Sequence, residues 1–308
     1  MLPIKFINLA RRKDRLENFQ KEMKKHNIIN YDRFNAIDGK TIELNDYINN
    51  LFKNNNFRWR RGIMGAILSH IAIWKELINS DYDYYLIFED DIKLNKNFNK
   101  FFDDIKKIIF TNIYPFIFLG YHTHNPLFKH PFRINNNNNK INIIELIVKK
   151  NIWGGLFGYI IHKQFAIKLI NDISQNGIID PIDTYILKQY DLYTCVPSIV
   201  HSPFMTFDNL VDSDIQYDLL GLYDGYEFFS ELDSPGYDIK WVNIVTIDQL
   251  LDAADKEPKC IAFNTYGFLK YDICYPENFI KLPGCNSKVH GIYIKKSFLE
   301  DKIKNKLS

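Results

Sequence analysis

The sequence predicts an α/β fold of the doubly wound type, in which helices cover both faces of a mostly parallel sheet. Apolar runs at 4–9, 84–88 and 115–120 are typical of buried strands. Residues 11–27 and 97–109 place apolar side chains at helical spacing among charged ones, which indicates amphipathic helices. The chain therefore begins strand, helix, strand, with polar residues where the strands end.

Composition bounds the class of protein. The 308 residues are 46% hydrophobic and 15% aromatic, enough to bury a large core. The formal net charge of +2 gives no electrostatic reason to expect a nucleic acid or an anionic membrane as partner.

Membrane and targeting signals are also missing from the sequence. No apolar run reaches the roughly 18 residues of a membrane span. The first residues, MLPIKFINLARRKDR, run apolar and then basic, the reverse of a secretory signal. As it stands, the chain is expected to be soluble and cytoplasmic.

The cysteines show no metal-binding spacing. None of Cys195, Cys260, Cys274 and Cys285 forms a CxxC pair, which disfavours a zinc knuckle. Three of them follow residue 250, so a disulfide in the C-terminal part and buried free thiols are both open.

Further elements follow in order between the first strand and the acidic stretch. A second strand near 31–37 ends at Asp38 and Gly39, a turn signal. Residues 41–56 are expected to form a helix and a loop, and 63–80 a buried helix carrying Ser69 and His70. Taken alone, such a histidine is more often a satisfied core residue than a ligand.

The middle of the chain predicts three more elements. Strands are expected at 156–161, opened by Trp153 and two glycines, and at 192–200, ending on His201. A helix at 165–173 lies between them. In the DPID sequence at 180–183, an acid before proline is typical of a helix start, so Asp180 is a candidate N-cap.

The composition and pattern of the sequence change after about residue 217. Glycines and prolines separate short aromatic runs, which predicts a small β-rich or α+β module over 218–308, after a domain over 1–217. Residues 260–270 resemble the apple or PAN type of binding module, without its full cysteine framework.

Three consecutive acids, Glu89, Asp90 and Asp91, follow the strand at 84–88. Carboxylates are costly to bury unless they are paired or bind metal, so the cluster is expected at the strand's carboxyl end, where α/β sheets bind ligands. Hard oxygen ligands there suit magnesium or manganese, and such a cation suits nucleotide phosphates. A solvated acidic turn is the alternative. The lack of a G-x-G-x-x-G and of a P-loop argues against dinucleotide binding and P-loop chemistry.

Six segments together resemble glycosyltransferase family 25, which includes lipopolysaccharide glycosyltransferases and procollagen galactosyltransferases. They stand in the family's order over about residues 3–215. The segments are FINL at 6–9, followed by Arg11, Arg12, Asp14 and Arg15; FNAIDG at 34–39; GIMGAILSHIAIW at 62–74; LIFEDD at 86–91; GLFGYII at 155–161; and DPIDTY at 180–185.

The resemblance implies a GT-A fold and a UDP-sugar donor, UDP-galactose or UDP-glucose, with Mn²⁺ or Mg²⁺. The residues that it places around the uridine pocket are Asn8, Leu9, Arg11 and Arg15, with Asp38, Ser69 and His70 nearby. It makes residues 89–91 the DxD-type motif. Asp91 is then the first choice of metal ligand, with Glu89 as a further one, and Asp90 or Glu89 could instead hold the ribose or the sugar. His201 is either a late metal ligand or an orienting histidine.

The acceptor side follows from the same resemblance. An inverting transfer needs a carboxylate base, for which Asp183 is favoured over Asp180, whereas a retaining transfer would not need one. Trp153, Gly154 and Gly155 are expected to form an aromatic platform and a close backbone approach to the sugar, with a buried core tryptophan as the alternative.

Three activities stay open. A hexosyltransferase acting on collagen-type hydroxylysine or galactosyl-hydroxylysine is favoured over one acting on lipopolysaccharide or another glycan. A glycan-binding protein on an inactive transferase scaffold and a metal-dependent hydrolase are the other classes. No oligomeric state is predicted.

Overall fold

The computed structural model describes residues 2–57, 59–123, 141–145, 152–203, 225–243, 247–285 and 290–307. The chain divides into two compact units, one made of residues 1–59 and 63–204 and the other chiefly of 205–308. The domain boundary predicted after residue 217 falls within 204–224, outside the described residues.

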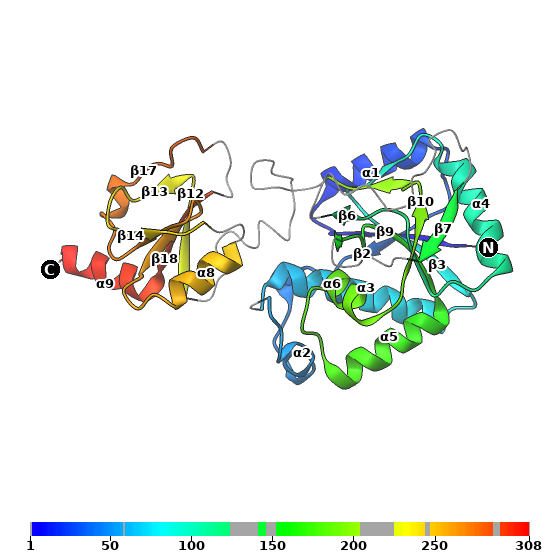
Figure 1. Cartoon of the computed structure of the whole chain (residues 1–308), viewed down its shortest axis with the longest axis horizontal. Coiled ribbons are helices and arrows are strands. Elements are labelled where there is room, and N and C mark those ends of the chain that lie inside the picture. Colours follow the sequence, from blue (N-terminus) through cyan, green and yellow to red (C-terminus); the bar gives the residue numbers. More distant parts are fainter. Residues whose placement is uncertain are drawn as a thin grey trace. The chain divides into compact units, whose positions relative to one another are not determined.

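The first unit is a mixed α/β structure, as the sequence predicted (Figure 1). Its helices are α1 (Lys13–Lys25), α2 (Asp46–Phe52), α3 (Arg61–Asn79), α4 (Phe98–Thr111), α5 (Lys163–Asn176) and α6 (Ile182–Gln189), with a short 3-10 turn at Gly39–Thr41. Its strands are β1 (Ile4–Asn8), β2 (Asp32–Asn35), β3 (Tyr84–Glu89), β4 (Lys93–Leu94), β5 (Phe116–Phe118), β6 (His122–Thr123), β7 (Asn142–Glu145), β8 (Ile152–Gly154), β9 (Gly158–His162), β10 (Tyr193–Val196) and β11 (Val200–His201).

Seven of these strands form one sheet in the order β2-β1-β3-β9-β5-β10-β7. β1 is parallel to β2 and β3, and β5 is parallel to β10. β9 runs antiparallel to both β3 and β5, and β7 antiparallel to β10. The carboxyl ends of β1, β3 and β5 and the amino end of β9 therefore meet at one edge of the sheet.

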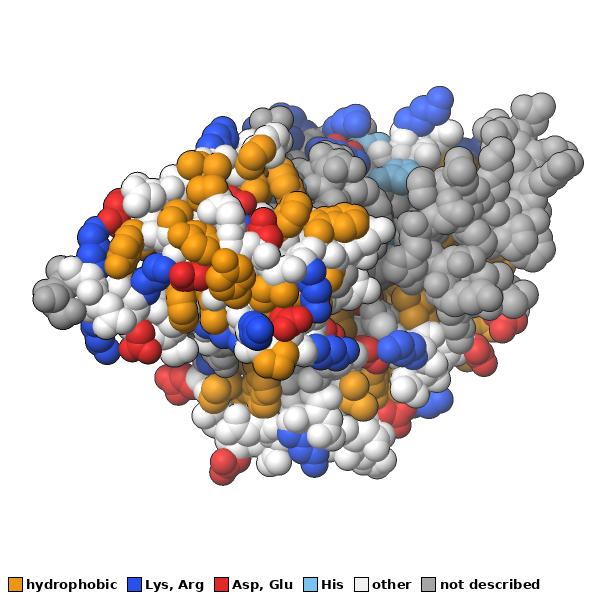
Figure 2. Space-filling view, turned by 60° about the vertical axis from the view of Figure 1, so that its left-hand side comes forward, with side chains coloured by type: hydrophobic (Ala, Val, Ile, Leu, Met, Phe, Trp, Pro, Cys, Tyr) orange, Lys and Arg blue, Asp and Glu red, His pale blue; other side chains and the backbone are white. Residues whose placement is uncertain are grey.

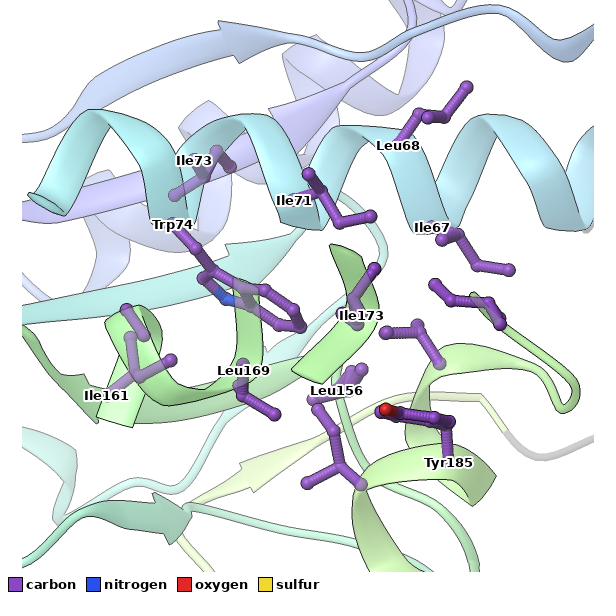
Figure 3. Close-up of a cluster of buried hydrophobic side chains, with 14 of the residues drawn as sticks. Ile67, Leu68, Ile71, Ile73, Trp74, Leu156, Ile161, Leu169, Ile173 and Tyr185 are labelled. Carbon is purple, nitrogen blue, oxygen red and sulfur yellow. The ribbon is translucent and has the colours of Figure 1, made fainter. Parts of the chain in front are cut away.

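Helices cover both faces of this sheet, as Figure 1 shows, because each face buries its own apolar cluster. α1 and α4 pack on one face. On the other face α3 is the central helix, and its side chains Ile67, Ile71 and Trp74 point toward Leu169 and Ile173 of α5 (Figure 3). α3 is apolar on most of its faces because α2, α5 and the sheet bury it together.

The second unit is an antiparallel α+β structure. Five strands pair in the order β12-β18-β15-β16-β14, and β13 and β17, distant in the sequence, pair in a separate antiparallel sheet. The elements are β12 (Tyr226–Ser230), β13 (Leu232–Asp233), β14 (Asp238–Trp241), α8 (Ile247–Asp255), β15 (Ala262–Asn264), β16 (Phe268–Lys270), a 3-10 turn at Pro276–Asn278, β17 (Ile280–Lys281), β18 (Gly291–Lys295) and α9 (Lys296–Leu307).

Two features of this unit bear on its stability and surface. All four cysteines of the chain are free thiols, and Cys260 and Cys285 are buried here, so the disulfide alternative is not realised. Hydrophobic side chains are frequent on the face of the unit turned toward the reader in Figure 2. Among the unit's exposed aromatic residues, Trp241 is 56% and Tyr271 53% accessible.

Across the described parts of the chain, no helix combines the length and apolarity needed to cross a bilayer.

Candidate functional site

Acidic and amide side chains gather at the sheet edge where β1 and β3 end. Asn8 is the last residue of β1 and Glu89 the last of β3, and the two strands pair in parallel. Polar groups at this edge are expected in an α/β sheet, because the strand interiors are buried on both faces. The acidic run at 89–91 therefore lies where the sequence predicted it.

Asp90 links the end of β3 to β1 and α1 through two hydrogen bonds. Its side chain is buried and accepts hydrogen bonds from Asn8 Nδ2 at 2.6 Å and from an Arg15 guanidinium nitrogen at 2.8 Å. Burial raises the pKa of Asp90, although the charge of Arg15 and these hydrogen bonds oppose the shift. Because both carboxylate oxygens are engaged, Asp90 is better placed to position Arg15 than to bind ribose or sugar.

Asp91 lies next to the same arginine but is differently bound. Its Oδ2 is 3.4 Å from Arg15, and its Oδ1 accepts a hydrogen bond from Ser202 Oγ at 3.1 Å. Burial and the nearby charge of Glu89 raise the pKa of Asp91 to about 6. Two carboxylates that destabilise each other in this way form a site at which a cation is favourable.

The predicted metal set of Glu89, Asp91 and His201 is not assembled as three ligands. Among the described residues, no group of three or more His, Cys, Asp and Glu side chains is close enough to hold a metal ion. His201 is exposed on β11, which pairs with β4 so that His201 lies opposite Lys93. Glu89 and Asp91 alone still fit a cation of the magnesium type, which takes one or two carboxylates and shares its other positions with water and phosphate.

The predicted uridine-pocket residues are held on the same side of the site by the turn after β2. Arg11 Nε donates to Asp38 Oδ2 at 2.8 Å, and the backbone N–H of Lys40 donates to Asp38 Oδ1 at 3.0 Å. Burial alone would raise the pKa of Asp38, but these hydrogen bonds have the larger combined effect and lower it. Leu9 is half-buried, and its carbonyl accepts the Arg12 N–H at 2.9 Å, which turns the chain into α1.

Ser69 and Gly65 dock α3 against that turn. Ser69 Oγ accepts the N–H of Ile37 at 2.8 Å and donates to the Gly65 carbonyl at 2.7 Å. A Cβ on Gly65 would lie 2.5 Å from the Ile37 carbonyl oxygen and 2.8 Å from the Gly39 nitrogen. The α3 backbone at Gly65 therefore lies too close to the turn for any residue with a Cβ. Ser69 has a structural role, because its hydroxyl bonds to both the turn and the helix.

His70, one residue further along α3, is both a core residue and a neighbour of the acidic cluster. It is buried, and its Nδ1 lies 2.8 Å from the Tyr159 hydroxyl. Its Nε2 faces Glu89 Oε1 at 3.6 Å. The core role that the sequence favoured for His70 is confirmed, and a role in ligand binding stays a prediction.

Asp183 comes from the first turn of α6 and meets the end of β8. Its Oδ1 accepts the N–H of Thr184 at 2.8 Å. A Cβ on Gly154 would lie 2.6 Å from its Oδ2, so only glycine lets the carboxylate lie this close to the strand. Burial raises the pKa of Asp183 to about 6, and the charge of Glu89 adds to the shift. Such a carboxylate is a stronger proton acceptor than a solvated one.

The N-cap role predicted for Asp180 is wrong, and its role as the second choice of base stays a prediction. It is buried, and its Oδ1 accepts from Asn56 Nδ2 at 2.6 Å and from Lys188 Nζ at 2.7 Å. The N-cap of α6 is Pro181, not Asp180. Because this carboxylate fixes the loop at Asn56 to α6, Asp180 is a structural residue.

The glycines next to Trp153 make close backbone approaches within the protein, and the predicted approach to a sugar stays a prediction. Gly155 packs inward, where a Cβ would lie 2.9 Å from the Phe118 ring. Gly154 makes its close approach to Asp183, as described above. Trp153 lies in β8, and its side chain is outside the described residues.

This geometry can be set beside known proteins. The family model described as "Glycosyltransferase family 25 (LPS biosynthesis protein)" matches residues 1–186, which include the acidic run and Asp183. The chain belongs to glycosyltransferase family 25. Its activity class is therefore glycosyl transfer, as the sequence predicted.

Relatives of this family-25 chain carry transferase names. Putative glycosyltransferase R655 of Acanthamoeba polyphaga mimivirus is 33% identical over 97% of this chain and 95% of its own length. Putative fucosyltransferase R654 of the same virus is 26% identical over 88% of this chain, which is 44% of that protein. Human procollagen galactosyltransferase 2 is 30% identical over 30% of this chain, and the match spans 16% of that protein.

Of two further residues near the acidic cluster, Ser202 was not predicted from the sequence, whereas His122 was raised with His124 as a possible metal chelator, hydrogen bonding or solvation being the alternative. Ser202 bonds to Asp91 across 111 positions, and nothing in its local sequence signals that contact. His122 lies opposite Gly154 in the β6–β8 pair and packs against the Phe157 ring with centroids 4.8 Å apart. Burial lowers the pKa of His122, against the attraction of Glu89. The position of His122 directly after the strand at 115–120 was the available signal.

Proposed function

We propose that this family-25 enzyme is a metal-dependent transferase that moves galactose or glucose from a UDP-sugar to a hydroxyl acceptor, on a domain of GT-A type. The observation that carries the proposal is the pairing of Glu89 and Asp91 at the end of β3, where mutual repulsion and burial favour a bound cation. Arg15 pairs with Asp90 and lies 3.4 Å from Asp91, so one positive charge faces three carboxylates and the cluster keeps an excess of negative charge.

Glu89 and Asp91 would hold Mn²⁺ or Mg²⁺ together with the donor phosphates. Bound there, the metal supplies Lewis-acid stabilisation of the charge that builds on the departing nucleoside diphosphate. Arg15 would add a positive charge beside the donor phosphates. It donates a hydrogen bond to Asp90 and lies 3.4 Å from Asp91.

The nucleoside would lie between the end of β1 and the turn after β2. Asn8, Leu9, Arg11 and Arg15 border this region, with Asp38 held by Arg11. The buried Asn8 Oδ1 has no hydrogen-bond partner among the described residues. Buried amide oxygens are normally satisfied, so a donor group on the ligand is a reasonable partner.

The acceptor hydroxyl would approach Asp183. In an inverting transfer, the hydroxyl oxygen forms the new bond to the sugar's anomeric carbon as the bond from that carbon to the phosphate oxygen breaks and UDP leaves with the electron pair, while the hydroxyl proton passes to a carboxylate oxygen of Asp183. The Thr184 N–H orients that carboxylate, and Gly154 leaves space for it. In a retaining transfer Asp183 would instead bind the acceptor without removing its proton.

The acceptor is proposed to be collagen-type hydroxylysine or galactosyl-hydroxylysine, with lipopolysaccharide or another glycan as the alternative. The collagen class is supported by the similarity to procollagen galactosyltransferase 2. The viral relative that matches nearly the whole chain carries only the general name of glycosyltransferase.

A donor and acceptor panel tests this proposal. Purified protein with manganese would be incubated with UDP-galactose, UDP-glucose, UDP-N-acetylglucosamine or GDP-fucose, and nucleotide release followed. Each donor is tested without acceptor, with deglycosylated collagen peptide, with galactosyl-hydroxylysine peptide and with a lipopolysaccharide core.

We expect acceptor-dependent UDP release with one hexose donor. Release that is equal with and without acceptor would indicate a hydrolase. Glycan binding without any release would indicate an inactive scaffold. Release from GDP-fucose alone would overturn the assignment of a UDP-hexose donor.

A further inference from the structure

A line of buried polar side chains connects the interior of the first unit to the acidic cluster. Trp74 and His70 lie four residues apart on α3 and so share one face of the helix. Tyr159 of β9 lies beside Ile87 of β3, two residues before Glu89. Tyr159 and Trp74 are fully buried, and His70 is 2% accessible. These groups are therefore shielded from water, and their hydrogen bonds must be satisfied among themselves.

The direction of the protons along this line follows from the chemistry of each group. The Trp74 indole N–H can only donate, so the Tyr159 oxygen accepts from it at 2.9 Å. The single hydroxyl proton of Tyr159 is then free to go to His70 Nδ1, 2.8 Å away. If Nδ1 carried the proton instead, the buried Tyr159 hydroxyl would have no acceptor among its described partners, which is unfavourable.

His70 Nδ1 is therefore an acceptor, and the proton of the neutral imidazole is on Nε2. That nitrogen faces Glu89 Oε1 at 3.6 Å. The distance is longer than a hydrogen bond, but an N–H dipole aimed at a carboxylate is attractive, whereas the lone pair of the other tautomer would repel it. Site hydrogen bonds are often long before substrate is bound.

We propose that His70 is a positioning residue for Glu89, kept in its Nε2–H tautomer by Tyr159 and Trp74. The inference deepens the proposed function and rests on it, since it explains how one of the two metal-binding carboxylates is oriented. Mutating a residue that contacts and orients a metal ligand commonly lowers metal affinity or activity by about 10- to 100-fold.

The test compares Tyr159→Phe with wild type by two readouts. Nitrogen NMR of protein labelled with ¹⁵N-histidine reports the His70 tautomer directly and needs no substrate, with His70→Gln used to assign the signal. The second readout is kcat and KM for the UDP-sugar that the panel identifies. Tyr84→Phe is the matched control, because it removes one hydroxyl that accepts the Tyr114 N–H at 3.2 Å, in the strand that carries Glu89 but at its opposite end.

We expect wild type and Tyr84→Phe to show the Nε2–H tautomer and activities within about twofold of each other. Tyr159→Phe removes the donor to His70 Nδ1, so its Nδ1 signal should move toward that of a nitrogen without a hydrogen bond, and kcat/KM should fall about 10-fold or more. An Nδ1–H tautomer in wild type would overturn the proposal, as would unchanged kcat and KM in a Tyr159→Phe protein whose Nδ1 signal shows that the hydrogen bond is lost. If no donor is turned over, the proposed function fails, while the NMR result still decides whether the tautomer is fixed.

Discussion

Asp183 lies in an environment unlike that of an ordinary surface carboxylate. Burial raises its pKa to about 6, so it is protonated below that pH and ionised above it. As a base it must be ionised, and we therefore expect kcat to rise with pH through about 6 and then level off. Asp183→Asn should lower kcat by about 100-fold or more and remove this rise, with little change in donor KM. Steady-state kinetics from pH 5 to 8 measure both, and wild-type kcat in the mutant would contradict the assignment.

The same burial has a cost for stability. The folded-state pKa of Asp183 lies above its ordinary value of 3.8, so the folded protein binds the proton more tightly than the unfolded chain does. Stability from this group is full below about pH 4 and is lost as pH rises through about 6. We expect Asp183→Asn to be more stable than wild type at pH 7.5, by up to about 3 kcal/mol, and not more stable near pH 4. Urea unfolding at the two pH values tests this sign.

At the level of elements, the docking of α3 against the turn after β2 controls the geometry of the nucleotide side. Helix propensity alone predicts that Gly65→Ala would stabilise α3 by about 1 kcal/mol. The structure predicts the opposite sign, because the new Cβ would lie 2.5 Å from a backbone oxygen that cannot rotate away. We expect a loss of about 1 to 3 kcal/mol, measured by thermal or urea unfolding. Ala66→Gly on the same helix is the control, and it should cost only the propensity difference.

Most elements of the first unit could be predicted from the sequence, because each carries a local periodic signal. β3 and α4 are found within two residues of the predicted bounds. The reversed direction of β9 could not be predicted, since an apolar run does not state its direction and the pairing partners are distant. The strand expected at 192–200 is divided into β10 and β11 around Pro197.

Part of the candidate site has local signals in the sequence. The acidic run lies at the end of β3, as predicted, and Asp183 lies in the first turn of α6 beside Gly154 of β8, while their roles stay predictions. The different contacts of the three acids could not be predicted, because they depend on which carboxylate bonds to Arg15 and Asn8 in the folded chain. The engagement of Asp180 by Asn56 likewise joins residues 124 positions apart.

Over the whole molecule, the four free thiols predict a protein that does not depend on disulfides. Cys195, Cys260 and Cys285 are buried, and burial raises the pKa of Cys195 to about 12, so these thiols are protected. We expect only Cys274 to react readily with a thiol reagent in the folded protein and all four to react after unfolding without reductant. Fewer than four reactive thiols in the unfolded protein would contradict the assignment of free cysteines.

The proposed activity of the whole molecule depends on the carboxylates at the end of β3, where a cation is proposed to bind. The measurement to make is the rate of hexose transfer to acceptor against manganese concentration, for wild type and for Asp91→Asn. We expect transfer to stop in chelator and to return with added manganese. The mutant should lose at least about 100-fold in rate while it keeps its circular dichroism and melting temperature. Transfer that persists in chelator, or a mutant as active as wild type, would contradict a metal-dependent transferase at this site.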